Sequence, residues 1–224
     1  MEAFVVDLDS SKNQIMLKPI AHSFNNQAHQ INEAAEKIDK LIQNAKHSND
    51  GIVLNRNEIK EAFFSPFKPQ LKSAQVFLSH SHADKNKALK VKGYLEEDLD
   101  AECVFIDSLF WDYKDDVLNK LAKYDDISGI EDAFTLILRE SLQDMIEKCP
   151  YFVFLKSSNS VSNQDLLKIT YSAWIYEELK IAHSISESRP IPMMESMQVF
   201  HDISLFLESF ETITLKKLSQ QINS

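Results

Sequence analysis

One acidic residue, Glu178, lies where a helix of this sequence should carry only apolar side chains. At about 100° per residue, the apolar side chains of residues 172–185 form one continuous arc, and Glu178 falls inside it. The arc consists of Trp174, Ile175, Leu179, Ile181, Ala182 and Ile185. The neighbouring Glu177 projects from the opposite side, toward solvent. Because an unpaired buried charge is costly, Glu178 either waits in a cleft for a substrate or sits at the rim of the arc and pairs with a lysine.

Short apolar runs alternate with helical patterns from about residue 73 onward. We expect strands at 75–78, 103–106, 151–155 and 190–193, and helices at 84–99, 132–148 and 172–185. This alternation favours a parallel, doubly wound α/β sheet, which binds ligands at the carboxyl ends of its strands. Polar residues follow three of the strands, namely Ser79 and His80, Asp107 and Ser108, and Ser157, Ser158 and Asn159.

The first 70 residues have a different pattern. Residues 3–7 and 14–17 predict two short strands, and a long amphipathic helix is expected over about 22–46. The apolar stripe of that helix is Ile31, Ala35, Ile38, Ile42 and Ala45. Its four-three spacing is typical of a helix that packs on a partner, either within the chain or in a second copy. We therefore expect a small, mainly helical appendage over 1–70 and an α/β domain over 73–224.

Composition limits the classes of partner and the location. The 224 residues carry a net charge of −10 without a compensating basic block, which argues against sequence-independent binding to nucleic acid or to anionic lipid. No apolar run approaches the roughly 20 residues of a membrane span, and acids precede the short apolar patch near the amino terminus, unlike a secretory signal. Cys103 and Cys149 each lie in or beside a strand-like run, which suits reduced thiols. The expectation is a cytoplasmic protein.

Several ordered motifs resemble those of the Toll/interleukin-1 receptor (TIR) domain family, in particular its bacterial members. They are VFLSHSHADK from Val76, VFID from Val104, IEKCPYFVFLKSSNSVSN from Ile146 and SAWIYEEL from Ser172. The resemblance covers about residues 73–224 and implies a flavodoxin-like, five-stranded parallel sheet. Residues 107–131 and 164–171 depart from the family pattern, the first as a long acidic loop and the second as an insertion.

The resemblance implies one of two functions. The first is cleavage of the nicotinamide–ribose bond of NAD⁺, a substrate rather than a bound cofactor, by hydrolysis or cyclisation. Glu178 matches the catalytic glutamate of the family, and Trp174 matches the aromatic residue one turn before it. The other side chains that we expect near NAD⁺ are Ser79, His80, Asp107, Ser108, Ser157 and Trp111. The second function is a non-catalytic scaffold that acts through contacts between TIR domains.

The family setting would be antiphage defence, in systems such as Thoeris. There, such enzymes deplete NAD⁺ or make a nucleotide signal that a downstream effector detects. The expected partners are therefore NAD⁺, an effector that responds to the product, and further copies of this chain. Those copies would associate through TIR–TIR contacts and the helix at 22–46.

A remote alternative is a metal-dependent hydrolase. His80, His82 and Asp84 follow a strand, as in the zinc motif of the metallo-β-lactamases. Lys85 stands where that motif has its last histidine, and the chain has only three glycines for the loops that such a fold needs. No metal site is therefore assigned.

We expect elemental analysis of the purified protein to find no stoichiometric zinc, because Lys85 cannot replace a neutral histidine ligand near neutral pH. Turnover of NAD⁺ should likewise be unchanged by a chelator. One equivalent of zinc, removed by the chelator together with activity, would contradict both the absence of a metal site and the TIR resemblance.

Overall fold

The computed structural model describes residues 1–17, 36–41, 43–44, 46–48, 51–53, 55–64, 72–99, 103–106, 117–119, 122, 128–164, 167–186 and 201–223. The chain divides into two compact units. The first consists of residues 1–21, 73–108 and 143–224, and the second of 22–72 and 109–142. Nearly all of the residues expected to act on a substrate belong to the first unit.

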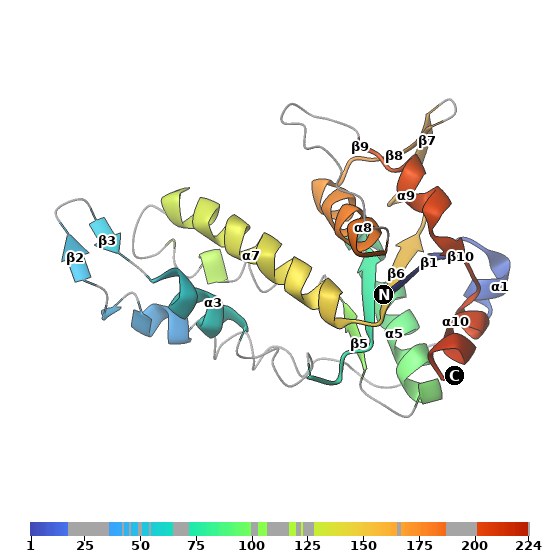
Figure 1. Ribbon diagram of the computed structural model, residues 1–224, viewed down its shortest axis with the longest axis horizontal. Coiled ribbons are helices and arrows are strands. Elements are labelled where there is room, and N and C mark those ends of the chain that lie inside the picture. The colour runs from blue at the N-terminus through green and yellow to red at the C-terminus, as the bar shows by residue number, and fades with distance from the viewer. Residues whose placement is uncertain are drawn as a thin grey trace. The chain divides into compact units, whose positions relative to one another are not determined.

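A five-stranded sheet forms the centre of the first unit (Figure 1). Its strands are β1 (Glu2–Asp7), β4 (Val76–His80), β5 (Val104–Ile106), β6 (Tyr151–Lys156) and β10 (Glu211–Thr212). They lie in the order β10-β1-β6-β4-β5, and every pairing is parallel. The longer strands are almost continuous apolar runs, as expected for strands covered on both faces. The predicted α/β class with a parallel five-stranded sheet is confirmed.

Strand β1 lies inside this sheet, between β6 and β10. Its six residues pair with β6 over their whole length, and Phe4 and Val5 also pair with Glu211 and Thr212 of β10. The side chains of Phe4, Val5 and Val6 are buried. Residues 1–21 therefore belong to the sheet unit, and the boundary expected near residue 70 does not hold for them. The strand expected at 190–193 lies outside the described residues.

Helices surround the sheet strands in the first unit. They are α1 (Ser11–Gln14), α5 (Lys85–Leu99), α8 (Ala173–Ser186), α9 (Ser204–Ser209) and α10 (Leu215–Ile222), with a 3-10 turn, η2 (His82–Asp84), before α5. Helix α8 packs against β1 and β4, and α5 packs against β4, β5 and α10. The helix expected at 172–185 is thus present with nearly the same bounds.

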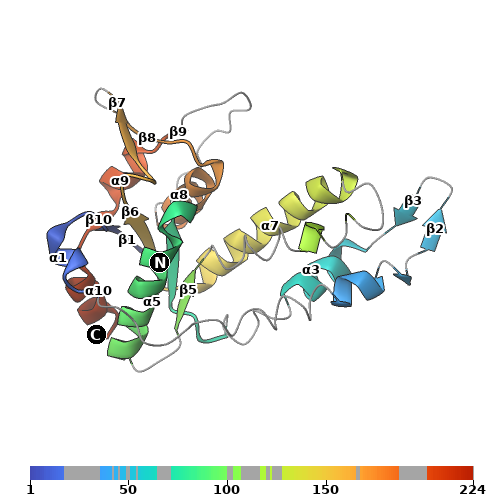
Figure 2. The same cartoon turned by 180° about the vertical axis from the view of Figure 1, so that it is seen from behind.

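The short helix α1 and the turn after it replace the strand expected at 14–17. The reason is a set of local hydrogen bonds, in which the carbonyl of Ser10 accepts from the amides of Asn13 and Gln14. The side-chain amide of Asn13 donates to the carbonyl of Asp7 at 2.7 Å and accepts from the amide of Leu215 at 3.1 Å. This buried side chain thus links α1 to the start of α10, and Figure 2 shows α1 and α10 near each other.

A small antiparallel sheet occupies the region of the insertion at 164–171. It consists of β7 (Ser162–Gln164), β8 (Leu167–Thr170) and β9 (His201–Asp202) in the order β7-β8-β9. Strand β8 leads directly into α8, and α9 follows β9. The insertion thus connects α8 with α9 through a sheet of its own, and α8 and α9 pack together.

The second unit contains the antiparallel pair β2 (Lys46–Ser48) and β3 (Gly51–Val53), and helix α3 (Arg56–Phe64). The division between the units falls within α7 (Ser128–Lys148). Of the helix expected at 22–46, residues 36–41 and 43 are described as helical, with Ile38 fully buried, whereas Lys46 begins β2 and is not part of a helix. The other stripe residues, Ile31, Ala35, Ile42 and Ala45, lie outside the described residues, so self-association through the stripe stays a prediction.

None of the described helices is long and apolar enough to cross a membrane. The two cysteines, Cys103 and Cys149, are both buried and free. Burial raises the pKa of Cys149 to about 12, so this thiol stays protonated near neutral pH.

The position of β1 predicts how the amino-terminal segment contributes to stability. Leu8, which follows β1, has no exposed surface, whereas Leu205 on α9 is 60% exposed. We expect Leu8→Ala to lower the free energy of unfolding by about 2–5 kcal/mol, because it opens a cavity in the core. Leu205→Ala, the matched control, should change it by less than about 0.5 kcal/mol. Equal and small effects in urea denaturation would contradict the placement of residues 1–21 in the sheet unit.

Candidate functional site

The position of Glu178 is set by the start of helix α8. The hydroxyl oxygen of Ser172 accepts a hydrogen bond from the amide of Ile175 at 3.2 Å, which is the geometry of a helix N-cap. Its carbonyl accepts from the amide of Tyr176 at 3.1 Å, which closes the first turn. Helix α8 then buries the side chains of Ile175, Glu178, Leu179, Ile181, Ala182 and His183. Glu178 is therefore on the buried face, with Trp174 half-buried one turn earlier.

The carboxylate of Glu178 contacts strand β4. Its Oε2 accepts a hydrogen bond from the hydroxyl of Ser79 at 2.5 Å, and neither residue has any exposed surface. The distance is at the short end of the range for a hydroxyl that donates to an ionised carboxylate. Full burial means that Glu178 lies neither at the rim of the apolar arc nor in an open cleft in this structure. A hydroxyl that donates to the carboxylate offsets part of the cost of taking a charge out of water.

Ser79 and His80 follow one another along β4, and successive side chains of a strand point to opposite faces. Ser79 faces helix α8, so His80 points to the other side of the sheet. Both side chains are buried. The structure thus brings Ser79 to Glu178 and does not place His80 on the same face, although the sequence alone grouped the two.

The carboxyl ends of β4 and β6 lie side by side, because Ser79 pairs with Phe154 and His80 with Leu155. After β4, the chain forms β5 on one side of β4 and then β6 on the other side. The pair β4 and β6 is therefore a topological switch point, the place where open α/β sheets bind ligands. Ser79 is the penultimate residue of β4, and Ser157 directly follows β6.

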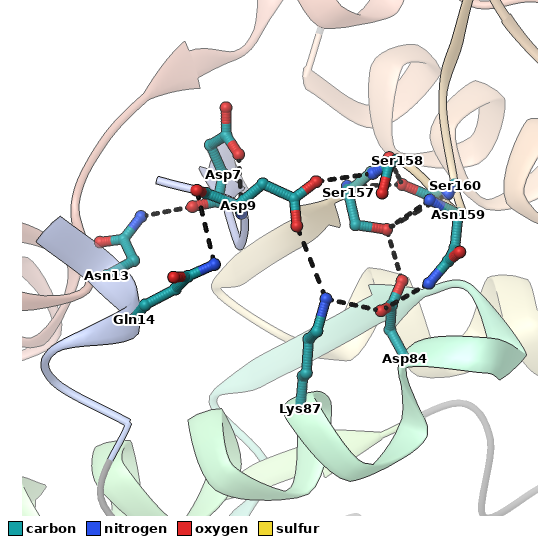
Figure 3. A network of polar contacts seen from close by, with 10 residues as sticks. All are labelled: Asp7, Asp9, Asn13, Gln14, Asp84, Lys87, Ser157, Ser158, Asn159 and Ser160. Atoms are coloured by element: carbon teal, nitrogen blue, oxygen red, sulfur yellow. Dashed lines mark hydrogen bonds and ion pairs between the residues drawn. The ribbon is translucent and has the colours of Figure 1, made fainter. Parts of the chain in front are cut away.

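Ser157, however, is already engaged by its own surroundings (Figure 3). Its hydroxyl donates to Oδ2 of Asp84 and accepts from the amide of Asn159 at 3.0 Å. The side chain is also buried. In this structure Ser157 fixes the turn after β6, rather than presenting its hydroxyl to a ligand as expected.

Asp84 is the centre of this polar network and is only 1% exposed. Its other oxygen, Oδ1, accepts from the amide group of Asn159 at 3.0 Å and contacts the ammonium group of Lys87 at 3.1 Å. Burial alone raises the pKa of Asp84, but the hydrogen bonds and the positive charge of Lys87 outweigh it, so the pKa lies below its ordinary value. The hydrogen bond with Asp84 in turn raises the pKa of Lys87.

Asp9, which follows β1, joins the same network, and sequence reasoning missed it. Its Oδ2 accepts from the amide of Ser158 at 2.8 Å, and its Oδ1 lies 3.5 Å from the ammonium group of Lys87 (Figure 3). The available signal was an acidic residue just after a buried strand, since the ends of parallel strands meet at one edge. That signal was lost because the strand had been assigned to a separate appendage.

Three of the expected substrate-binding residues, Asp107, Ser108 and Trp111, lie outside the described residues. For the zinc alternative, the described part of the chain holds no group of three histidine, cysteine or acidic side chains arranged to bind a metal ion. Both carboxylate oxygens of Asp84 already have partners in Ser157, Asn159 and Lys87. A zinc ion there would have to displace the contact between the buried carboxylate of Asp84 and the ammonium group of Lys87.

Comparison of the chain with protein-family models, with curated proteins and with solved structures found no match. The resemblance to the TIR family therefore rests on the sequence motifs alone. The parallel sheet is compatible with the flavodoxin-like fold of that family. Any functional conclusion has to be argued from the site itself.

The lowered pKa of Asp84 predicts how stability depends on pH. A carboxyl group with a lowered pKa in the folded state stabilises the protein above its unfolded pKa of about 3.9, and this contribution is lost as the pH falls through the folded value. Asp84→Asn removes the titration, so we expect its free energy of unfolding to fall less than that of the wild type between pH 5 and acid pH. The control is Glu208→Gln at an exposed carboxyl group. Parallel curves for the wild type and Asp84→Asn would contradict the assignment.

Proposed function

We propose that this protein cleaves the nicotinamide–ribose bond of NAD⁺ and that Glu178 is the catalytic carboxylate. The observation that supports this most directly is the fully buried carboxylate, held by Ser79 at the switch point of a parallel sheet. A carboxylate that served only packing would be replaced at lower cost by an apolar side chain of similar size. A buried carboxylate such as Glu178 is expected where its negative charge takes part in a reaction.

The chemistry needs a negative charge rather than a strong acid. Nicotinamide leaves NAD⁺ as a neutral molecule, so positive charge develops on the ribose as the bond to its C1′ breaks. A preorganised carboxylate beside the ribose stabilises that oxocarbenium-like transition state, and apolar surroundings increase its effect by excluding water. Water then attacks C1′ and releases a proton, which gives ADP-ribose. Capture by a group within the same molecule gives a cyclic product instead.

Because Glu178 has no exposed surface, a ribose can reach it only when the side chains that cover it move. We expect Trp174, which is one turn earlier and half-buried, to contact the substrate after such a movement. The enzyme is therefore expected to respond to a trigger or to association between copies. By the motif resemblance, we assign the reaction to cytoplasmic antiphage defence, through a product that signals to an effector or through loss of NAD⁺.

A non-catalytic scaffold is the alternative function. A scaffold acts through its surface, so it gains nothing from a carboxylate with no exposed area. The arrangement of Glu178 and Ser79 on facing elements therefore favours the enzyme.

The direct test is mass spectrometry of NAD⁺ incubated with purified protein. We expect Glu178→Gln to reduce turnover by at least about 100-fold, because one preorganised charge contributes about 3 kcal/mol to transition-state stabilisation. Circular dichroism should show that the variant is folded, since glutamine can still accept the hydrogen bond from Ser79.

The matched control is Glu177→Gln, on the same helix. Glu177 is half-buried and lies 3.8 Å from the ammonium group of Lys180, in an i,i+3 pair. Its substitution should change turnover by less than about two-fold, because i,i+3 pairs contribute only tenths of a kcal/mol. Turnover that survives Glu178→Gln would rule out the mechanism, and equal losses in both variants would show that the effect is structural.

A further inference from the structure

The geometry points to Ser79 as a positioning residue that orients the carboxylate of Glu178, and not as a residue that binds NAD⁺. This inference rests on the proposed function, since it concerns the residue that we place at the reacting ribose. It changes the role that the sequence suggested, in which Ser79 was one of the polar side chains expected to contact the substrate.

The hydroxyl proton of Ser79 is already used within the fold. A serine hydroxyl has one proton to donate, and Ser79 gives it to Oε2 of Glu178 at 2.5 Å. It cannot donate to NAD⁺ at the same time. Both side chains are fully buried, so water does not compete for this hydrogen bond.

Strand β4 and helix α8, which carry Ser79 and Glu178, are both held by their neighbours. Ser79 is on β4, which is paired on both sides by β5 and β6, and Ser79 itself pairs with Phe154. Glu178 is on α8, which packs against β4 and β1. The terminal torsion of a glutamate has a broad energy profile, so the carboxylate plane is not fixed by the helix alone. A donor on a central strand supplies that restraint.

The consequence for catalysis is a selective effect on the chemical step. A misplaced carboxylate stabilises the transition state less, while NAD⁺ binds through the rest of its surface as before. We therefore expect Ser79→Ala to lower kcat by about 10-fold or more, with KM for NAD⁺ changed by less than about two-fold. Ser79→Thr keeps the hydroxyl and should recover most of kcat.

A buried serine elsewhere in the fold provides the control. The hydroxyl of Ser219 on α10 also donates to a carboxylate, that of Asp98, and its side chain is 1% exposed. Ser219→Ala should leave kcat and KM unchanged. Melting temperatures of Ser79→Ala, Ser79→Thr and Ser219→Ala show whether a loss of activity comes from unfolding or from a misplaced Glu178 carboxylate. A rise in KM of about 10-fold with unchanged kcat in Ser79→Ala would assign Ser79 to substrate binding and overturn the inference.

A spectroscopic measurement tests the contact without relying on activity. In protein labelled with ¹³C at the glutamate carboxyl carbons, the signal missing from Glu178→Gln belongs to Glu178. At a single pH, this signal should move in Ser79→Ala, return toward its original position in Ser79→Thr, and stay in place in Ser219→Ala. An unchanged signal in Ser79→Ala overturns the inference whatever the turnover. If the Glu178 signal moves in Ser79→Ala but the wild-type protein leaves NAD⁺ intact, the proposed function is overturned while the contact between Ser79 and Glu178 stands.

Discussion

Strand β1 is the connection on which the remaining structure of the first unit depends. Its backbone pairs with β6 on one side and with β10 on the other, so within the described residues β10 joins the sheet through β1. The same segment anchors the helix after β10, because the side chain of Asn13 accepts from the amide of Leu215. A segment at the start of the chain thus holds the last strand and the last helix in place.

Two buried carboxylates near the ends of the sheet strands are stabilised in different ways. Asp84 contacts an ammonium group and two further donors, an environment that favours its ionised form and fixes the start of α5 to the turn after β6. Glu178 accepts from the neutral hydroxyl of Ser79. A hydroxyl on a central strand orients the carboxylate, which suits a group that would have to stand in one position beside a substrate.

The sequence predicted most of the elements, and it predicted the buried position of Glu178 from the period of its helix. It could not predict the neighbours of β1, because alternation along a strand identifies a strand without specifying its partner. Apolar residues at 15–17 resembled a strand, yet Ile15 is largely exposed after the turn that Ser10 and Asn13 form. Ser79 and His80 were grouped because they are adjacent, although adjacency in a strand separates side chains onto two faces. Asp9 follows a buried strand, which is a local signal, but its contact with Ser158 joins residues far apart in the chain, and no local pattern specifies that partner.

The place of β1 also determines when the sheet can form during synthesis. Residues 2–7 pair with 151–156, and Phe4 and Val5 also pair with 211–212, so β1 leaves the ribosome well before its partners have been synthesised. At 5–20 residues per second, about 10–40 s pass before the last of them is available. During that interval an apolar strand is without its partners, which favours capture by chaperones or pairing with a neighbouring nascent chain. The same long-range pairing makes slow folding of the isolated protein the expected behaviour.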